Sequence, residues 1–276
     1  YFHTICRNGE VNIIPLIDCP KDYEPEFASI IRLIKDKGSV ALKPDEGSHG
    51  NGFFRCDFIE GKYYLNYEEA SEQRVIDILS GEGAYIVTEY IQMHPDLKRI
   101  YSGSVNTIRM IVFKKDGVHP KIGNAYMRIG TESTGAIDNM AAGGMFAAID
   151  VNTGFYGNSK IFIDGDIKDC PVHPNTGIEI KGVIPNWERT KQIVLRIAES
   201  INELEFFGFD LAVTEDGIKI PEINRYPDYP KIETFNRATI DYLLYKLEKK
   251  KIRFMKNGKL RKTLIHLPYR DETLFE

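Results

Sequence analysis

The sequence predicts an α+β protein, in which hairpins of neighbouring strands are accompanied by a few amphipathic helices. Two turn dipeptides, Asp216–Gly217 and Glu60–Gly61, each join runs that read as neighbouring strands. Residues 27–34 instead repeat their apolar side chains at helical spacing, and that helix is expected to stop at Gly38. With 276 residues, the chain is long enough for one large domain or two small ones.

Composition excludes several classes of protein. The net charge is −4 with 28% charged residues, so no basic excess indicates a nucleic-acid partner, and no apolar run has the length of a membrane span. The four cysteines lack C-x-x-C spacing, which favours reduced thiols in a cytoplasmic protein over a disulfide frame or a zinc site. The first residue is Tyr1 and no signal-peptide pattern follows, so we expect that the natural N-terminus has been trimmed.

The hairpin at residues 206–224 carries three oxygen-bearing side chains. If its loop has three residues, Asp210 lies opposite Glu222, and Asn224 follows on the same face. Two facing carboxylates repel by about 4 kcal/mol at ~4 Å in an effective dielectric near 20, so the pair calls for a cation such as Mg²⁺. The alternative is a solvated hairpin with scattered acids, because a slip of one residue turns Asp210 to the other face.

A second candidate site begins at the strand predicted for residues 39–44, which carries Lys43 and runs into the glycine-rich loop 45–54. Backbone N–H groups of such a loop can surround an anion, and an ammonium beside them suits a polyphosphate. The loop is neither a Walker A motif nor a dinucleotide fingerprint. A surface turn after an edge strand is the alternative.

The central part of the chain adds a helix predicted for 68–79 and a strand predicted for 84–91. In a nucleotide cleft, the backbone at the exit of this strand, near Glu89, can contact adenine, and an acid beyond it, such as Asp96, is available for a ribose hydroxyl. The strands predicted for 105–113 and 121–129 carry Arg109 and Arg128. Because buried charges need partners, these arginines either face solvent or meet an anion.

The C-terminal part contains the longest predicted helix, which begins after a candidate N-cap at Asn186 and is expected to pack on the sheet that contains the 206–224 hairpin. A proline-rich loop at 225–231 and a helix near 234–249 follow. The basic residues of 246–262 are interpreted as a solvated face.

Taken in order, these features resemble the ATP-grasp superfamily over about residues 23–250. The features are Lys43, the loop 47–52, the strand exit at Glu89–Ile91, the strand arginines, Asp210, and Glu222-x-Asn224. In detail the chain is most similar to the sugar-transfer-associated branch, which has glutamate-ligase-like relatives. The parts that carry this finer resemblance are residues 139–150 and 207–210.

The resemblance implies ATP clamped between antiparallel sheets of two α+β subdomains, at 23–95 and 96–250. Residues 1–22 would be a remnant of a preceding domain, and 251–276 a basic tail. The implied nucleotide-binding residues are Lys43, Ser48, His49, Gly50, Asn51, Gly52, Glu89, Tyr90, Ile91 and Asp96. Asp210, Glu222 and Asn224 would hold one or two Mg²⁺ ions, with Mn²⁺ as an alternative. Arg128, Arg109 and Asn139 would stabilise the phosphate in transfer.

The implied reaction joins a small carboxylic acid to an amine through an acyl phosphate, with release of ADP. The implied setting is surface polysaccharide or sugar-conjugate synthesis, with a sugar or sugar nucleotide as a candidate partner. Two departures from the family pattern stand out: besides Lys43, no additional phosphate-binding lysine lies in a clear register ahead of the glycine-loop hairpin, and the 225–230 loop has no Pro-Gly turn. A kinase acting on a hydroxyl and a non-catalytic nucleotide-binding module therefore stay open as alternatives. No oligomeric state is predicted.

Overall fold

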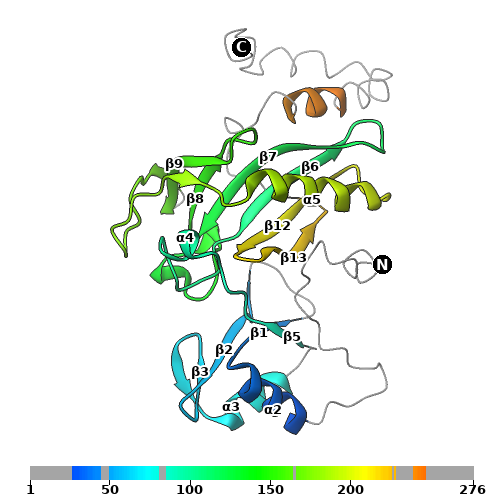
Figure 1. The fold of residues 1–276 in the computed structure, drawn as a ribbon. Coiled ribbons are helices and arrows are strands. Elements are labelled where there is room, and N and C mark those ends of the chain that lie inside the picture. Colours follow the sequence, from blue (N-terminus) through cyan, green and yellow to red (C-terminus); the bar gives the residue numbers. More distant parts are fainter. Residues whose placement is uncertain are drawn as a thin grey trace, which may run out of the picture.

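Two antiparallel sheets form the framework of the described residues in the computed structural model (Figure 1). The structure describes residues 27–44, 50–80, 85–163, 166–225, 227 and 239–246. The predicted N-terminal segment 1–22, the tail 251–276, and the loop residues Ser48 and His49 lie outside these ranges.

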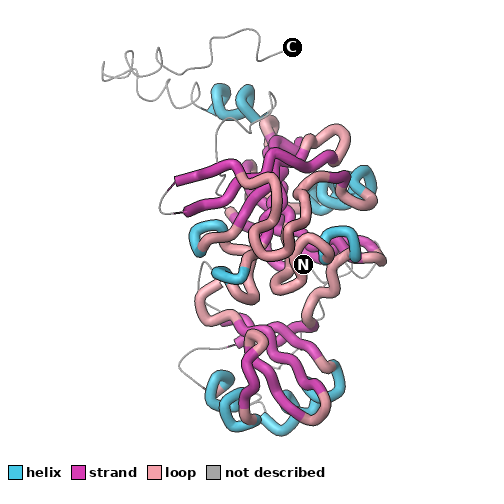
Figure 2. Tube along the Cα trace, turned by 90° about the vertical axis from the view of Figure 1, so that its left-hand side faces the viewer, coloured by secondary structure: helices cyan, strands magenta, loops and turns pink. Residues whose placement is uncertain are grey.

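The smaller sheet has the order β4-β3-β2-β1-β5. Its strands are β1 (Ser39–Pro44), β2 (Phe54–Ile59), β3 (Lys62–Leu65), β4 (Glu68–Ala70) and β5 (Tyr85–Glu89). Helices α2 (Phe27–Lys37) and α3 (Glu72–Leu79) cover the face that points away from the larger sheet (Figure 2). Side chains alternate between the faces of a strand, so Val40, Leu42 and Val87 pack under the helices while Lys43 and Thr88 take the opposite face.

The helix predicted for 68–79 is shorter than expected. Residues Glu68–Ala70 pair with β3 as strand β4, and the helix begins at Glu72. Ser71 sets this boundary, because its side chain accepts a hydrogen bond from the backbone N–H of Arg74 at 3.1 Å and so caps the first turn.

The larger sheet runs in the order β10-β9-β8-β7-β6-β12-β13, with β11 paired to β9. Its strands are β6 (Ile108–Lys114), β7 (Pro120–Ile129), β8 (Met145–Ile149), β9 (Phe155–Ile163), β10 (Asp166–Asp169), β11 (Gly182–Val183), β12 (Phe206–Thr214) and β13 (Gly217–Asn224). The other elements are α4 (Pro95–Lys98), α5 (Trp187–Ser200), the 3₁₀ turns η1 (Glu132–Thr134) and η2 (Met140–Ala142), and a helical stretch at 239–246. None of the helices in the described ranges combines the length and apolar character of a membrane span.

Helix α5 packs across the larger sheet, as predicted, and completes its core. Trp187, Val194 and Ile197 are buried against residues of β6, β7 and β12, and the Trp187 indole donates to the carbonyl of Val151 at 2.9 Å. Asn186 occupies the N-cap position but does not cap with its side chain, because its backbone is left-handed, with φ 53°.

The hairpin of β12 and β13 differs from the prediction at its turn. Thr214 pairs with Gly217, so the loop has two residues rather than three. A bulge then restores the expected pairing, since Leu211 lies opposite both Ile220 and Pro221, and Asp210 pairs with Glu222. Proline has no N–H to donate to a ladder, which suits it to a bulge.

Candidate functional site

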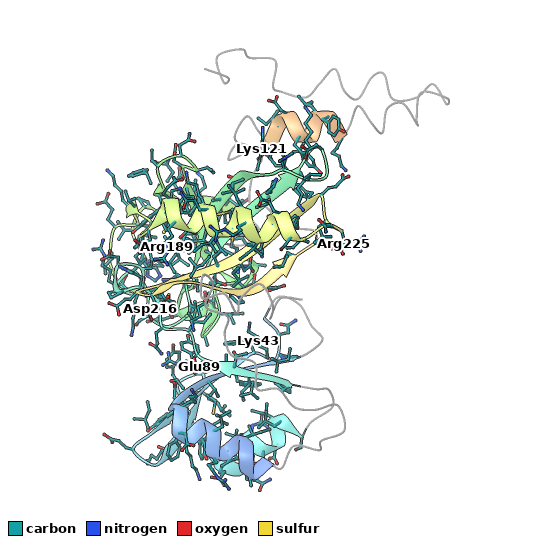
Figure 3. The ribbon with its side chains drawn as sticks, turned by 45° about the vertical axis from the view of Figure 1, so that its right-hand side comes forward. Lys43, Glu89, Lys121, Arg189, Asp216 and Arg225 are labelled. Atoms are coloured by element: carbon teal, nitrogen blue, oxygen red, sulfur yellow. The ribbon has the colours of Figure 1, made fainter. Side chains whose placement is uncertain are left out.

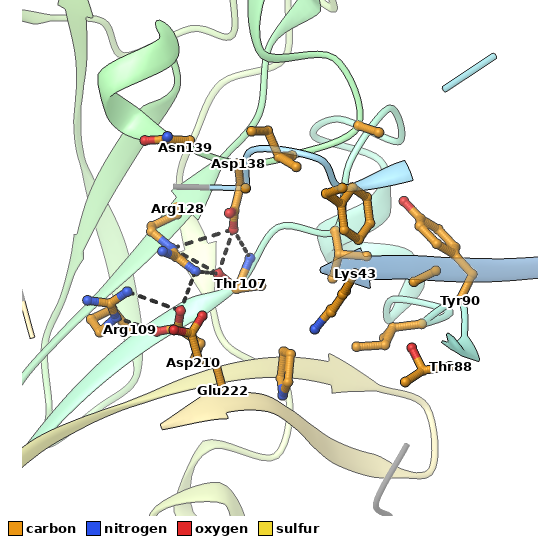
Figure 4. Close-up of a pocket in the computed structure, with 18 of the residues that line it drawn as sticks. Lys43, Thr88, Tyr90, Thr107, Arg109, Arg128, Asp138, Asn139, Asp210 and Glu222 are labelled. Atoms are coloured by element: carbon orange, nitrogen blue, oxygen red, sulfur yellow. Dashed lines mark hydrogen bonds and ion pairs between the residues drawn. The ribbon is translucent and has the colours of Figure 1, made fainter. Parts of the chain in front are cut away.

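A cavity of about 490 Å³ lies between the two sheets, and its volume falls in the range of small-molecule sites (Figure 4). The smaller sheet contributes residues of β1 and β5 to its wall. The larger sheet contributes residues of β6, β7, β12 and β13, and the loop 136–140 closes one side. The cavity therefore joins segments that are far apart in the sequence.

Lys43 enters the cavity from β1, on the face of the small sheet that points toward the larger one (Figure 3). Its ammonium has no hydrogen bond or ion pair with any residue that the structure describes. Burial lowers the pKa of Lys43, and the charges of Glu222 and Asp210 across the cavity oppose that effect. A half-buried ammonium without a partner is a ready contact for an anion.

Asp210 is held by two arginines from neighbouring strands. It lies directly opposite Arg109 of β6, whose Nε and Nη2 donate to both carboxylate oxygens, Nη2 at 3.0 Å. Arg128 of β7 donates from Nη2 to Asp210 Oδ2 at 2.7 Å. The sequence left open whether these arginines face solvent or meet an anion. In the structure they meet an anion, the carboxylate of Asp210.

Glu222 and Asn224 lie two residues apart on β13 and both line the cavity. Glu222 is exposed, with no hydrogen bond or ion pair among the described residues. Asn224 has a buried amide nitrogen to which none of the described residues gives a hydrogen-bond partner. An unsatisfied amide in a cavity wall is the kind of group that a ligand completes.

This donor set fits Mg²⁺ bound together with a nucleotide. The described residues contain no group of three or more His, Cys, Asp or Glu side chains placed to hold a metal ion. Magnesium, however, usually takes one or two carboxylates and completes its shell with waters and substrate phosphates. Glu222 and Asn224 would hold the ion, and Asp210 could contribute Oδ1, which accepts one hydrogen bond, from Arg109 Nε, whereas Oδ2 accepts from both arginines.

The other end of the cavity is lined by Tyr90 and Ile91, which follow β5. The Tyr90 ring is buried, with the Arg55 guanidinium 4.4 Å from its centroid. Glu89 also lines the cavity, and its side chain lies on the same face of β5 as the core residue Val87 and pairs with Lys37 of α2 at 2.7 Å. Its contact with a nucleotide stays a prediction.

The glycine loop is described from Gly50 onward, and Gly50 lines the cavity. It has a positive φ of 76°, and a Cβ there would lie 2.8 Å from the Ile137 side chain, so the chain needs glycine at this point. Asn51 and Gly52 continue the turn but are not part of the cavity wall.

Comparison with known proteins identifies the family. A model of the family described as sugar-transfer associated ATP-grasp matches residues 5–249. The chain belongs to this family. The α+β class and the ATP-grasp fold predicted from the sequence are thereby confirmed. No curated protein matches the sequence.

Several solved structures are similar to this ATP-grasp chain at low identity. D-alanine–D-alanine ligase from Bacillus anthracis is 12% identical, with a TM-score of 0.43 over 93% of this chain and 67% of that one. D-alanyl-alanine synthetase A from Vibrio cholerae O1 biovar eltor is 10% identical, with a TM-score of 0.49 over 91% and 63%. N5-carboxyaminoimidazole synthetase from Staphylococcus aureus is 10% identical, with a TM-score of 0.45 over 84% and 44%. The chain thus spans about two thirds of the first of these proteins and less of the other two.

Two predicted ATP-grasp site residues have a different role or place. Asp96 lies in the first turn of α4, outside the cavity wall, where its backbone N–H donates to the His94 ring at 3.2 Å. Asn139 does line the cavity, but its side-chain oxygen accepts from the backbone N–H of Ala141 at 2.9 Å and so caps the turn η2. That oxygen is already engaged within the protein.

The sequence interpretation missed Thr107 and Asp138, which are buried in the wall of the ATP-grasp cavity. Both contact Arg128, and Thr107 precedes the start of β6. Asp138 belongs to the loop that also carries Asn139. No local pattern distinguishes either residue, because their contact joins positions 31 residues apart.

Proposed function

We propose that this ATP-grasp protein binds Mg-ATP between its two sheets and uses it to join a carboxylate to an amine. The observation that supports this most strongly is the placement of Lys43. Its ammonium, which has no ion-pair partner among the described residues, projects from one sheet toward the carboxylates and arginines of the other, so cationic side chains face the cavity from both walls. A triphosphate requires such an arrangement.

Different residues of the cavity would bind the phosphates and the nucleobase of ATP. Lys43 and the backbone at Gly50 would bind phosphate oxygens, and Arg128 with Arg109 would neutralise the charge of the phosphate in transfer. The nucleobase would lie against Tyr90 and Ile91. We propose 23–95 and 96–250 as the two units that bring these groups together.

Mg²⁺ would be held by Glu222 and Asn224, with Asp210 as a further ligand. When bound, the ion neutralises phosphate charge and fixes the orientation of the phosphate chain. Mn²⁺ suits the same oxygen ligands.

The chemistry requires no nucleophile from the protein. The substrate carboxylate attacks the γ-phosphorus of ATP, the bond to the bridging oxygen breaks, and ADP leaves. The resulting acyl phosphate is opened by the amine, which expels inorganic phosphate and forms the amide. Positioning and cationic charge carry most of the catalysis in phosphoryl transfer. We further propose that the acid or the amine belongs to a sugar or sugar nucleotide, in surface polysaccharide synthesis in the cytoplasm.

The proposal is tested by measuring ADP release from Mg-ATP with a panel of uronic acids, amino acids and amines. The expected result is ADP release that depends on an acid and an amine together. A stable phosphorylated product from a single hydroxyl compound would contradict a ligase and support a kinase. Absence of nucleotide binding would contradict both.

Replacing Lys43 with methionine separates binding from folding. We expect Lys43→Met to bind ATP roughly 10- to 100-fold more weakly, since a hydrogen bond to a charged group contributes about 1.5–3 kcal/mol. The unliganded protein should unfold at the same or a higher temperature, because burial disfavours the ammonium in the free protein. Calorimetric titration and thermal unfolding measure the two effects, and an unchanged ATP affinity would rule out the phosphate role.

A further inference from the structure

Thr107 and Asp138 form a polar pair beside Arg128 in the cavity wall (Figure 4). Asp138 Oδ2 accepts a hydrogen bond from the Thr107 backbone N–H at 2.9 Å and another from the Thr107 hydroxyl at 2.5 Å. Both residues are buried. The pair therefore ties the residue just before β6 to the 136–140 loop.

The donor and the acceptor of each hydrogen bond around Thr107 are fixed. Thr107 Oγ1 lies 3.0 Å from Arg128 Nε and 2.6 Å from Arg128 Nη2. A guanidinium donates hydrogen bonds and cannot accept them, so the hydroxyl accepts from Arg128 and gives its own proton to Asp138. Asp138 Oδ2 itself lies 3.6 Å from Arg128 Nε. The Thr107 hydroxyl thus bridges Asp138 and the arginine.

Arg128 has a second anchor in Asp210, to which Nη2 donates at 2.7 Å. A bound Mg-nucleotide would affect Asp210 and the Thr107–Asp138 pair differently. Asp210 lies opposite Glu222, where Mg²⁺ would bind, whereas Asp138 belongs to the loop on the other side of Arg128. If Asp210 turns to the metal, Thr107 and Asp138 are the partners that Arg128 keeps.

We propose that Thr107 and Asp138 are positioning residues that hold the Arg128 guanidinium toward the terminal phosphate of ATP while Asp210 serves the metal. This inference rests on the proposed function. It explains why a threonine hydroxyl and a carboxylate are buried in a cavity wall, where each would be costly without the arginine.

The test compares Thr107→Val with Thr107→Ser. Valine keeps the branched shape and the backbone N–H contact to Asp138 but loses the hydroxyl, and serine keeps the hydroxyl. Binding of Mg²⁺ with the β,γ-imido analogue of ATP, and of Mg²⁺ with ADP, is measured for each variant by calorimetry. We expect Thr107→Val to lose about tenfold in affinity for the triphosphate analogue and to bind ADP within about twofold of the wild type. Thr107→Ser should match the wild type for both ligands.

Other results would overturn the inference. Equal weakening of both nucleotides by Thr107→Val would show general damage to the site, and so would a serine variant no better than valine. Asp138→Asn, which keeps the shape and removes the charge, should show the same selective loss and serves if the valine variant does not fold. If neither variant folds, the pair maintains the fold and the inference is wrong. A wild-type protein that binds neither nucleotide would instead contradict the proposed function.

Discussion

We expect Glu222→Gln to lower turnover sharply while leaving the fold intact. Glu222 is exposed and has no partner among the described residues, so its replacement should change the free energy of unfolding by less than about 0.5 kcal/mol. Glutamine keeps the size of the side chain but removes the charge that would hold Mg²⁺. Turnover should fall by on the order of 100-fold or more, because transition-state charge stabilisation is lost.

The matched control is Glu215→Gln, which removes the same charge from the exposed turn of the same hairpin. The control should have wild-type turnover and wild-type stability. ADP release is followed across a series of Mg²⁺ concentrations, and Glu222→Gln should require more Mg²⁺ for half-maximal rate. Wild-type turnover in Glu222→Gln would remove the metal role assigned to this residue.

Asp210→Asn should differ from Glu222→Gln by a large loss of stability. Asp210 is buried and accepts hydrogen bonds from both Arg109 and Arg128, so the variant leaves one buried and one partly buried guanidinium without their shared counter-charge. Removing one partner of a buried ion pair costs about 3–5 kcal/mol. Arg128 retains Asp138 nearby, which places the expected loss at the lower end of that range.

Urea titration of Asp210→Asn measures this loss, with Asp216→Asn in the exposed turn as the control. The control should stay within about 0.5 kcal/mol of the wild type, because Asn-Gly is itself a favourable hairpin turn. Equal stability of the two variants would show that the arginine–carboxylate cluster contributes little to the fold. The comparison with Glu222→Gln then separates a residue that holds the site together from one that serves only the ligand.

The hairpin shows how far local sequence patterns reach. The period-2 alternation and the Asp216–Gly217 dipeptide predicted two paired strands, and the expected pairing of Asp210 with Glu222 is confirmed. The predicted loop was one residue too long. The bulge at Pro221 adds one residue to β13 and so brings Asp210 opposite Glu222 all the same. A proline within a strand fits either an edge or a bulge, so the sequence alone could not reveal the bulge.

The faces of β5 were harder to predict. Residues 85–91 place apolar side chains on both faces of the strand, so the pattern of apolar and polar residues does not tell which face packs on the helices. Only the packing of Val87 under α2 and α3 shows that Glu89 lies on the helix side, beside Lys37. Lys43 was easier, because a lysine at the end of a buried strand needs an open or anionic environment.

The network around Arg128 could not be predicted from local patterns at all. Thr107 and Asp138 are polar residues near the ends of apolar segments, which is an ordinary place for them. Their roles arise from contacts across 31 and 21 residues of sequence, made when the sheet forms and the 136–140 loop folds back on it. Such contacts depend on topology rather than on spacing.

The most direct test of the account is a crystal structure of the protein with Mg²⁺ and the β,γ-imido analogue of ATP. We expect the triphosphate to lie between Lys43 of the small sheet and the β13 residues Glu222 and Asn224, with the adenine against Tyr90 and Ile91. A nucleotide bound outside the cavity between the sheets, or a triphosphate that touches neither Lys43 nor the metal ligands on β13, would contradict it.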